Sequence, residues 1–314
     1  MNKFTIAKEN CKACGLCAAV CPKNLLGASK EFNSKGYNFY EISDMTACIG
    51  CGLCYTTCPE AAIKVERDNK VVASRPNALM SDASTYCPGC SHGIVQRVIA
   101  EIIDEENLRE DTVGVTPIGC AIFIYKYMDL DFVEGAHGRA PAVATGVKRA
   151  LSEKLVFTYQ GDGDITAIGI SEVMHAAIRN ENICVIFVNN GIYGMTGGQT
   201  APTTLIGQVT ASSPKGKRLS DGTPVHMCEI ISSIGGNHYL ARGAVDTPAH
   251  IKTLKEYIRK AFLRQKNHGG FSMIEILGTC PSGWKMDPVD AAKRITEEVI
   301  PVFPLGEIQV PKEV

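Results

Sequence analysis

Twelve of the fourteen cysteines fall into three groups, and their spacing indicates which chemistry each group can do. Two groups repeat one pattern, C-x₂-C-x₂-C-x₃-C-P, over residues 11–22 and 48–59. Thiolates spaced this closely wrap around a small inorganic core, and in paired runs the fourth cysteine binds the other cluster. The sequence therefore predicts two 4Fe–4S clusters, one held by Cys11, Cys14, Cys17 and Cys58 and the other by Cys48, Cys51, Cys54 and Cys21.

Zinc or disulfides are the alternatives for these cysteines. Zinc ribbons place two CxxC pairs far apart, and a run of four closely spaced cysteines does not fit that pattern. The third group, at positions 87, 90, 120 and 280, is scattered along the chain. From spacing alone its first two members also suit a zinc half-site, and the other two suit plain core thiols. Cys184 and Cys228 are expected to be ordinary core residues.

A second kind of chemistry is indicated by Gly-Asp-Gly-Asp at 161–164 and by Asn189-Asn190. Each motif ends an apolar run, and one strand–helix–strand crossover separates Asp162 from Asn190. Both are therefore expected at the carboxyl ends of neighbouring parallel strands, where open sheets bind ligands. The glycines leave room for a phosphate near a helix N-terminus, and the carboxylate and amide oxygens suit Mg²⁺. Two ordinary turns are the alternative.

The elements that must position these groups alternate along the second part of the chain. Apolar runs at 155–160, 183–190 and 271–277 predict buried strands, and 166–181 and 248–266 predict helices. Continuous apolar strands that alternate with helices favour an α/β fold, with a doubly wound parallel sheet covered on both faces.

Composition and internal repetition divide the chain. Residues 1–68 contain the cysteine repeat, 69–84 lack periodicity and are expected to be a linker, and 85–314 form the larger domain. Apolar residues make up 45% and charged residues 21%, and the net charge is −1, so neither nucleic acid nor a membrane is an expected partner. The start of the chain has no apolar run typical of a secretory signal, which favours a cytoplasmic metalloprotein.

Several segments together resemble the thiamin-diphosphate-binding β subunits of 2-oxoacid:ferredoxin oxidoreductases. They are YCPGCSHG (86–93), PIGC (117–120), AHGRAPAVATGVK (136–148), GDGDITAIG (161–169), RNENICVIFVNNGIYGMTGGQTAPTT (179–204) and CPSGW (280–284). The resemblance covers essentially all of residues 85–285. It implies a thiamin-diphosphate-binding domain with a doubly wound parallel sheet, preceded by a small α+β domain similar to bacterial ferredoxins.

The resemblance also implies roles for single residues. The expected ligands of a third 4Fe–4S cluster, close to the cofactor, are Cys87, Cys90, Cys120 and Cys280. The expected ligands of Mg²⁺ are Asp162, Asn190 and the carbonyl of Ile192. The residues expected to bind the cofactor are Gly161, Gly163, Asp164, Thr196 and, beside the cluster, Cys120. His137 and Arg139 are expected to line the cofactor cavity as catalytic residues. Ser91 and Gly197 depart from the family pattern, which commonly has glycine and, in some relatives, lysine there.

The activity implied is thiamin-dependent oxidative decarboxylation, with two electrons passing through three 4Fe–4S clusters to an external ferredoxin. Nothing in the chain matches the pyrimidine-binding half of a thiamin enzyme, so an α subunit is expected to supply it together with the activating acid. A γ subunit and a dimer of heterotrimers are also expected. Because the two-cluster domain is fused to the N-terminus, the layout looks like that of oxalate oxidoreductase. We therefore expect oxalate as substrate, with pyruvate, 2-oxoisovalerate and 2-oxoglutarate as alternatives.

Two functions of other classes fit less well. A non-redox thiamin decarboxylase leaves twelve cluster-spaced cysteines without a use, and a non-catalytic electron-transfer module leaves the Gly-Asp-Gly and Asn-Asn motifs without one.

Overall fold

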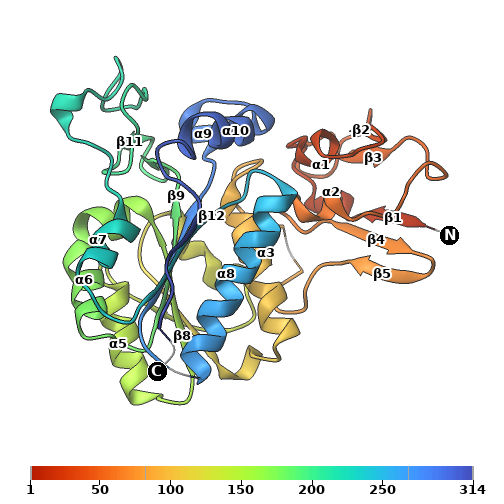
Figure 1. Ribbon diagram of the computed structural model, residues 1–314. Helices are drawn as coiled ribbons and strands as arrows, with labels where there is room; N and C mark the ends of the chain where they lie inside the picture. The colour runs from red at the N-terminus through yellow and green to blue at the C-terminus, as the bar shows by residue number, and fades with distance from the viewer. Residues whose placement is uncertain (1, 82, 268, 313–314) are drawn as a thin grey trace.

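Two lobes form the protein in the computed structural model, which describes residues 2–81, 83–267 and 269–312 (Figure 1). The N-terminal lobe has a three-stranded antiparallel sheet, a second strand pair and two short helices. Its elements are β1 (Lys3–Ile6), α1 (Leu16–Ala19), β2 (Leu26–Ala28), β3 (Tyr40–Ile42), α2 (Leu53–Thr56), β4 (Ile63–Arg67) and β5 (Lys70–Ala73). The two helices follow Gly15 and Gly52, both left-handed, and each carries the third cysteine of its run. The cysteine repeat is therefore also a structural repeat.

The expected linker, 69–84, begins too early. Residues 70–73 form β5, which pairs with β4 and extends the sheet of the N-terminal lobe. Asp68 and Asn69 make the turn between these strands, with φ of 51° and 61°. Two left-handed residues in succession are typical of a two-residue hairpin, and aspartate and asparagine tolerate that conformation. The lobe thus continues to residue 73.

The larger lobe is built on a seven-stranded sheet in the order β14-β12-β13-β9-β8-β6-β7. All neighbours are parallel except β14, which runs antiparallel to β12. The predicted parallel sheet is confirmed, and the antiparallel edge strand makes it a mixed sheet. The strands are β6 (Thr112–Thr116), β7 (Asp131–Glu134), β8 (Leu155–Gly161), β9 (Cys184–Asn189), β12 (Tyr239–Ala244), β13 (Ser272–Leu277) and β14 (Gly306–Gln309).

Helices cover both faces of this sheet (Figure 1). One face carries α3 (Ser91–Glu105) and α8 (Pro248–Asn267), and the other carries α5 (Ala140–Ala150), α6 (Ile170–Ile178) and α7 (Met227–Ser233). Each face has its own apolar core, and Cys184 and Cys228 are fully buried in these cores, as predicted. Short elements complete the lobe: α4 (Ile124–Tyr127), β10 (Ile192–Tyr193), β11 (Gln199–Thr200), α9 (Pro281–Trp284) and α10 (Pro288–Arg294).

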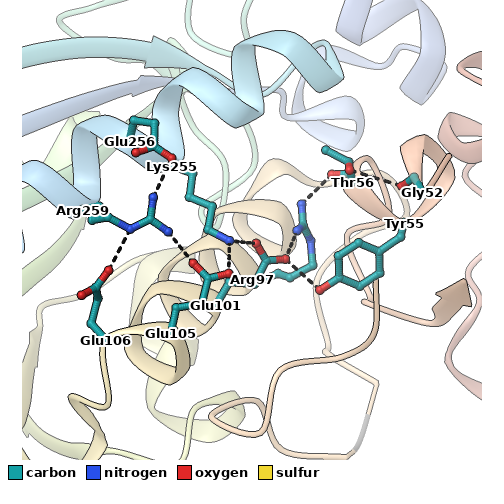
Figure 2. Close-up of polar contacts among 10 residues, drawn as sticks. All are labelled: Gly52, Tyr55, Thr56, Arg97, Glu101, Glu105, Glu106, Lys255, Glu256 and Arg259. Carbon is teal, nitrogen blue, oxygen red and sulfur yellow. Dashed lines mark hydrogen bonds and ion pairs between the residues drawn. The ribbon is translucent and has the colours of Figure 1, made fainter. Parts of the chain in front are cut away.

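An ion network joins the two lobes (Figure 2). Arg97 of α3 donates from Nη2 to the carbonyl oxygen of Thr56 on α2, at 2.5 Å, and pairs with Glu101. Tyr55 of α2 donates its hydroxyl to the same Glu101 carboxylate at 2.7 Å. Lys255 of α8 donates to the other carboxylate oxygen at 2.8 Å. The helix that carries Cys54, a predicted cluster ligand, is thus tied to both helices of one sheet face.

None of the helices in the described ranges has the length and the apolar composition needed to span a lipid bilayer.

Candidate functional site

The first pocket in the N-terminal lobe is lined by cysteines of both runs. Cys11, Cys14 and Cys17 meet Cys58, the last cysteine of the second run. Burial raises the pKa of the Cys14 thiol to about 12, and the nearby Cys58 adds to this shift. Burial also raises the pKa of Cys58, to about 11. The grouping agrees with the first ligand set expected from the spacing.

The second pocket has the reciprocal composition. It is lined by Cys48, Cys51, Cys54 and Cys21, among apolar side chains of β1, β2 and β4. Burial raises the pKa of Cys54 to about 12, and Cys51, Cys21 and Cys48 add to the shift. Cys51 is exposed, so this pocket reaches the protein surface.

The chemistry of these pockets fits iron–sulfur clusters. Buried thiols that raise one another's pKa resist ionisation, and a cationic metal core is what allows several thiolates to form side by side. Soft sulfur donors select metals of this kind. In the described parts of the chain, no three His, Cys, Asp or Glu side chains are placed to hold a single metal ion.

The third group of cysteines comes together from three separate segments. Cys87 and Cys90 precede α3, Cys120 follows β6, and Cys280 follows β13. A Cβ added at Gly194 would lie 3.2 Å from the sulfur of Cys280 and 3.8 Å from that of Cys120. Burial raises the pKa of Cys280 to about 12, and Cys120 and Cys87 add to the shift. Burial also raises the pKa of Cys90, with Cys280 as its strongest neighbouring thiol.

This third group abuts the first pocket. Gly89, between Cys87 and Cys90, has a φ of +73°, and a Cβ there would lie 2.4 Å from Cβ of Pro288. The same atom would lie 3.5 Å from Cβ of Cys14. The loop therefore needs glycine, and it lies in contact with a cysteine of the first pocket.

The Gly-Asp-Gly motif and Asn190 line one pocket, because β8 and β9 are parallel neighbours as predicted. Asp162 is buried, and its carboxylate accepts hydrogen bonds from Gly163 N at 2.7 Å, Gly191 N at 2.6 Å and Thr203 Oγ1 at 2.5 Å. Burial nevertheless raises its pKa to about 6. The other expected residues in the lining are Gly161, Asp164, Asn190, Ile192, Thr196, His137 and Cys120.

These groups fit a magnesium diphosphate. Asp162 and Asn190 bring a carboxylate and an amide oxygen to one pocket, and hard oxygen donors suit Mg²⁺. Among the described residues, the amide oxygen of Asn190 accepts only a long bond, 3.3 Å, from Ile192 N. At Gly163, an added Cβ would lie 2.2 Å from the ring of Tyr193, so a larger residue would force that ring to move.

The two expected catalytic residues differ in position. His137 lines the pocket, and its Nδ1 pairs with Asp164, which also accepts from Gly138 N at 2.7 Å. Arg139 is not in the pocket lining; it pairs with Glu172 of α6 and is half-exposed. Arg139 precedes the first turn of α5, and α6 packs beside α5, so the guanidinium reaches a carboxylate of the neighbouring helix.

Three supporting hydrogen bonds were not found by sequence reasoning. Asn189 donates to Glu275 at 2.7 Å, and Glu275 accepts from Arg242 at 2.8 Å, which fixes the backbone next to Asn190. His92, inside the YCPGCSHG motif, lines the pocket while its Nδ1 bonds the hydroxyl of Tyr159 at 2.6 Å. Burial lowers the pKa of His92 to about 4. The motif spacing marked the cysteines but gave no signal for the histidine's partner on β8.

Comparisons with known proteins agree with both lobes. Residues 118–276 match the family described as thiamine pyrophosphate enzyme, C-terminal TPP binding domain, and residues 10–62 match the 4Fe-4S dicluster domain.

Two named relatives are similar to this chain over most of its length. The ketoisovalerate oxidoreductase subunit VorA of Methanothermobacter thermautotrophicus is 41% identical over 236 residues, which are 74% of this chain and 49% of that protein. The 2-oxoglutarate synthase subunit KorB of Archaeoglobus fulgidus is 37% identical over 212 residues, 68% of this chain and 75% of that protein. The chain thus spans about half the length of the ketoisovalerate relative.

A solved structure is also similar. The 2-oxoglutarate:ferredoxin oxidoreductase from Magnetococcus marinus, with 2-oxoglutarate, coenzyme A and succinyl-CoA bound, matches with a TM-score of 0.62 and 28% identity. The match covers 70% of this chain and 72% of that one.

Proposed function

Because the chain belongs to the family of thiamine-pyrophosphate-binding subunits of 2-oxoacid:ferredoxin oxidoreductases, we propose that it is the β subunit of such an enzyme. The reaction is the oxidative decarboxylation of a 2-oxoacid, with electrons delivered to ferredoxin. One observation carries the proposal: Cys120 of the third cysteine group lines the same pocket as Asp162 and Asn190. A phosphate site and a thiol set that share one pocket suit a reaction that couples thiamin chemistry to electron transfer.

Different residues of this pocket have different roles in the proposed reaction. When bound, thiamin diphosphate supplies the electron sink that lets a 2-oxoacid lose CO₂. Asp162, Asn190 and the carbonyl of Ile192 would hold Mg²⁺, and Thr196, in the same pocket lining, would bind the diphosphate. Asp164 orients the His137 imidazole at the pocket wall. Strand β10 and the residues after it as far as Thr196 form part of the pocket lining, and in this proposal they limit the access of water.

Three 4Fe–4S clusters carry the electrons in this proposal. The third cysteine group holds the cluster nearest the cofactor, and the contact between Gly89 and Cys14 favours the first pocket as the next site. The second pocket comes last, because its Cys51 is exposed and accessible to a ferredoxin. This order follows from Gly89 of the third group lining the first pocket, and from an exposed cysteine in the second set where the first set has none.

Other subunits complete the enzyme. Both relatives described above are named as subunits, which supports a multisubunit assembly. An α subunit supplies the pyrimidine-binding half-site with its activating acid. A γ subunit and a dimer of heterotrimers belong to the same proposal.

The relatives favour a larger 2-oxoacid over oxalate as substrate. They are named for ketoisovalerate and for 2-oxoglutarate, and the similar solved structure contains coenzyme A. We therefore propose 2-oxoisovalerate as the first substrate to test, with coenzyme A as acyl acceptor, and 2-oxoglutarate as the second. The fused cluster domain, on which the expectation of oxalate rested, does not discriminate among these substrates.

The test is a substrate panel on the purified complex, following viologen or ferredoxin reduction with and without coenzyme A. Reduction with 2-oxoisovalerate that requires coenzyme A is the expected result. Reduction by oxalate without coenzyme A would refute the substrate assignment. Iron and thiamin analysis separates the other classes, since three 4Fe–4S clusters give about twelve irons per chain. A chain with thiamin but no iron is a simple decarboxylase, and one with iron but no thiamin is an electron-transfer subunit.

A further inference from the structure

A buried ion pair lies at the wall of the first cysteine pocket. Lys12 and Glu60 are 2.7 Å apart, and their side chains are only 7% and 5% exposed. Lys12 follows Cys11 directly, and Glu60 comes two residues after Cys58. Both line the pocket formed by the four cysteines of the first set. Neither residue has a part in the family chemistry described above.

The contacts of this pair fix both charges in place. The Lys12 ammonium donates to Glu60 Oε1 at 2.7 Å, to Ser84 Oγ at 2.9 Å and to the carbonyl oxygen of Tyr86 at 2.6 Å. These three acceptors match its three N–H bonds. The second oxygen of Glu60 accepts from Ser84 N at 2.9 Å. These hydrogen bonds therefore fix the position of residues 84–86, the segment that leads directly to Cys87.

The stability of the fold does not by itself explain why a buried Lys12–Glu60 ion pair is present here. A buried salt bridge contributes weakly to stability, because desolvating two charges costs about as much as their attraction returns. Apolar residues of similar volume would close the junction at least as well. The location of the pair is what distinguishes it: the pocket that it lines is also bounded by Gly89, in the loop of the third cysteine group.

We propose that Lys12 and Glu60 are positioning residues for electron transfer: the pair holds the Cys87–Cys90 loop against the cluster bound by Cys11, Cys14, Cys17 and Cys58, and its balanced charges keep the reduction potential of that cluster from being shifted by either charge alone. The inference rests on the proposed function, because it requires that cluster. A cluster gains one negative charge with each electron, so charges in a dry wall shift its potential. The intact pair places both signs there with no net charge, and either single neutralisation leaves one sign uncompensated.

Two substitutions of opposite sign test this assignment. Glu60→Gln leaves the Lys12 cation uncompensated and is expected to raise the midpoint potential of one cluster. The expected size is at least about tenfold in the one-electron reduction equilibrium, or ~59 mV. Lys12→Met leaves the carboxylate uncompensated and lowers the same potential. The double variant removes both charges and returns toward the wild-type value.

The measurement is a redox titration of the intact complex monitored by electron paramagnetic resonance. Lys8→Met and Glu31→Gln are the matched controls, because that pair in the same lobe is 3.9 Å apart and well exposed, 57% and 78%. Solvent screens exposed charges, so these variants are expected to leave all potentials unchanged. Lys12→Arg keeps the charge and is expected to retain the wild-type potential.

The outcomes separate the inference from the proposed function. A wild-type complex without 4Fe–4S signals would refute the function itself. The inference would be overturned if the signals are normal but the potentials shift in the same direction in both single variants, or do not shift. The ion pair would then have a purely structural role. If Glu60→Gln does not assemble, Lys12→Met and Lys12→Arg still decide the sign.

Discussion

Replacing Arg97 with methionine removes the guanidinium that joins the lobes, and the structure sets the size of the effect (Figure 2). Arg97 is 1% exposed and holds the Thr56 carbonyl oxygen at 2.5 Å. Losing one partner of a buried pair costs about 3–5 kcal/mol. Glu101 keeps Lys255 at 2.8 Å and the Tyr55 hydroxyl at 2.7 Å, which places the expected loss at the lower end, ~3 kcal/mol.

The assay is hydrogen–deuterium exchange of the α2 backbone amides in the cluster-loaded complex. Because each 1.4 kcal/mol is tenfold in an opening equilibrium, Arg97→Met is expected to speed their exchange on the order of a hundredfold. Arg259→Met is the matched control at the more exposed end of the network, where it bonds Glu106 at 3.0 Å and Glu256 at 2.6 Å. Its expected effect is below about 1 kcal/mol. Equal exchange in the two variants would contradict the reasoning.

Three further predictions concern the cysteines, the phosphate loop and pH. Cys58→Ser is expected to remove one cluster, about four irons per chain, whereas Cys184→Ser, in the core, is expected to keep the full iron content; equal iron in both would count against the ligand set. Gly163→Ala is expected to weaken thiamin diphosphate binding by more than about tenfold, measured by calorimetry, because its Cβ would meet the Tyr193 ring, while Gly146→Ala has open space and binds normally. Burial raises the pKa of Glu101, but Arg97 and Lys255 outweigh it and hold that pKa below its usual value. The stabilisation by this carboxylate is therefore present above its unfolded pKa, ~4.3, and is lost as the pH falls through the lower folded value, so acid is expected to lower the protection factors of the α2 amides more in the wild type than in Glu101→Gln; identical changes in protection would refute this.

The sheet of the larger lobe follows from its sequence pattern for a clear physical reason. Continuous apolar runs such as the one at 183–188 are buried on both faces, and only a sheet covered by helices on both sides provides that environment. The crossover distance between Asp162 and Asn190 then predicts their proximity, and both line one pocket. The edge strand β14 was not predicted, because a four-residue strand half-exposed at a sheet edge has no comparable apolar run.

The groupings of the two cysteine runs in the N-terminal lobe were predictable for a different reason. Cluster ligation requires soft donors at fixed spacing, and this spacing survives in the sequence whatever the fold around it. Contacts between side chains from distant segments leave no such pattern. Arg97 and Thr56, or His92 and Tyr159, belong to different elements, and nothing in their local sequence marks them as partners. The pairing of Arg139 with Glu172 is of the same kind.

Helix α3 connects these features mechanically. It begins directly after Cys90 of the third group, and two turns later its Arg97 holds the helix that bears Cys54 and precedes Cys58. Residues of one rigid helix keep constant separations, so the third group and the two pockets of the N-terminal lobe cannot move independently while Arg97 is in place. Lys12 fixes the same junction from the other side through Tyr86. Because electron transfer depends on separation, a loose junction would slow it even with every cluster intact. Loss of either contact is therefore expected to lower the rate of ferredoxin reduction without lowering the iron content.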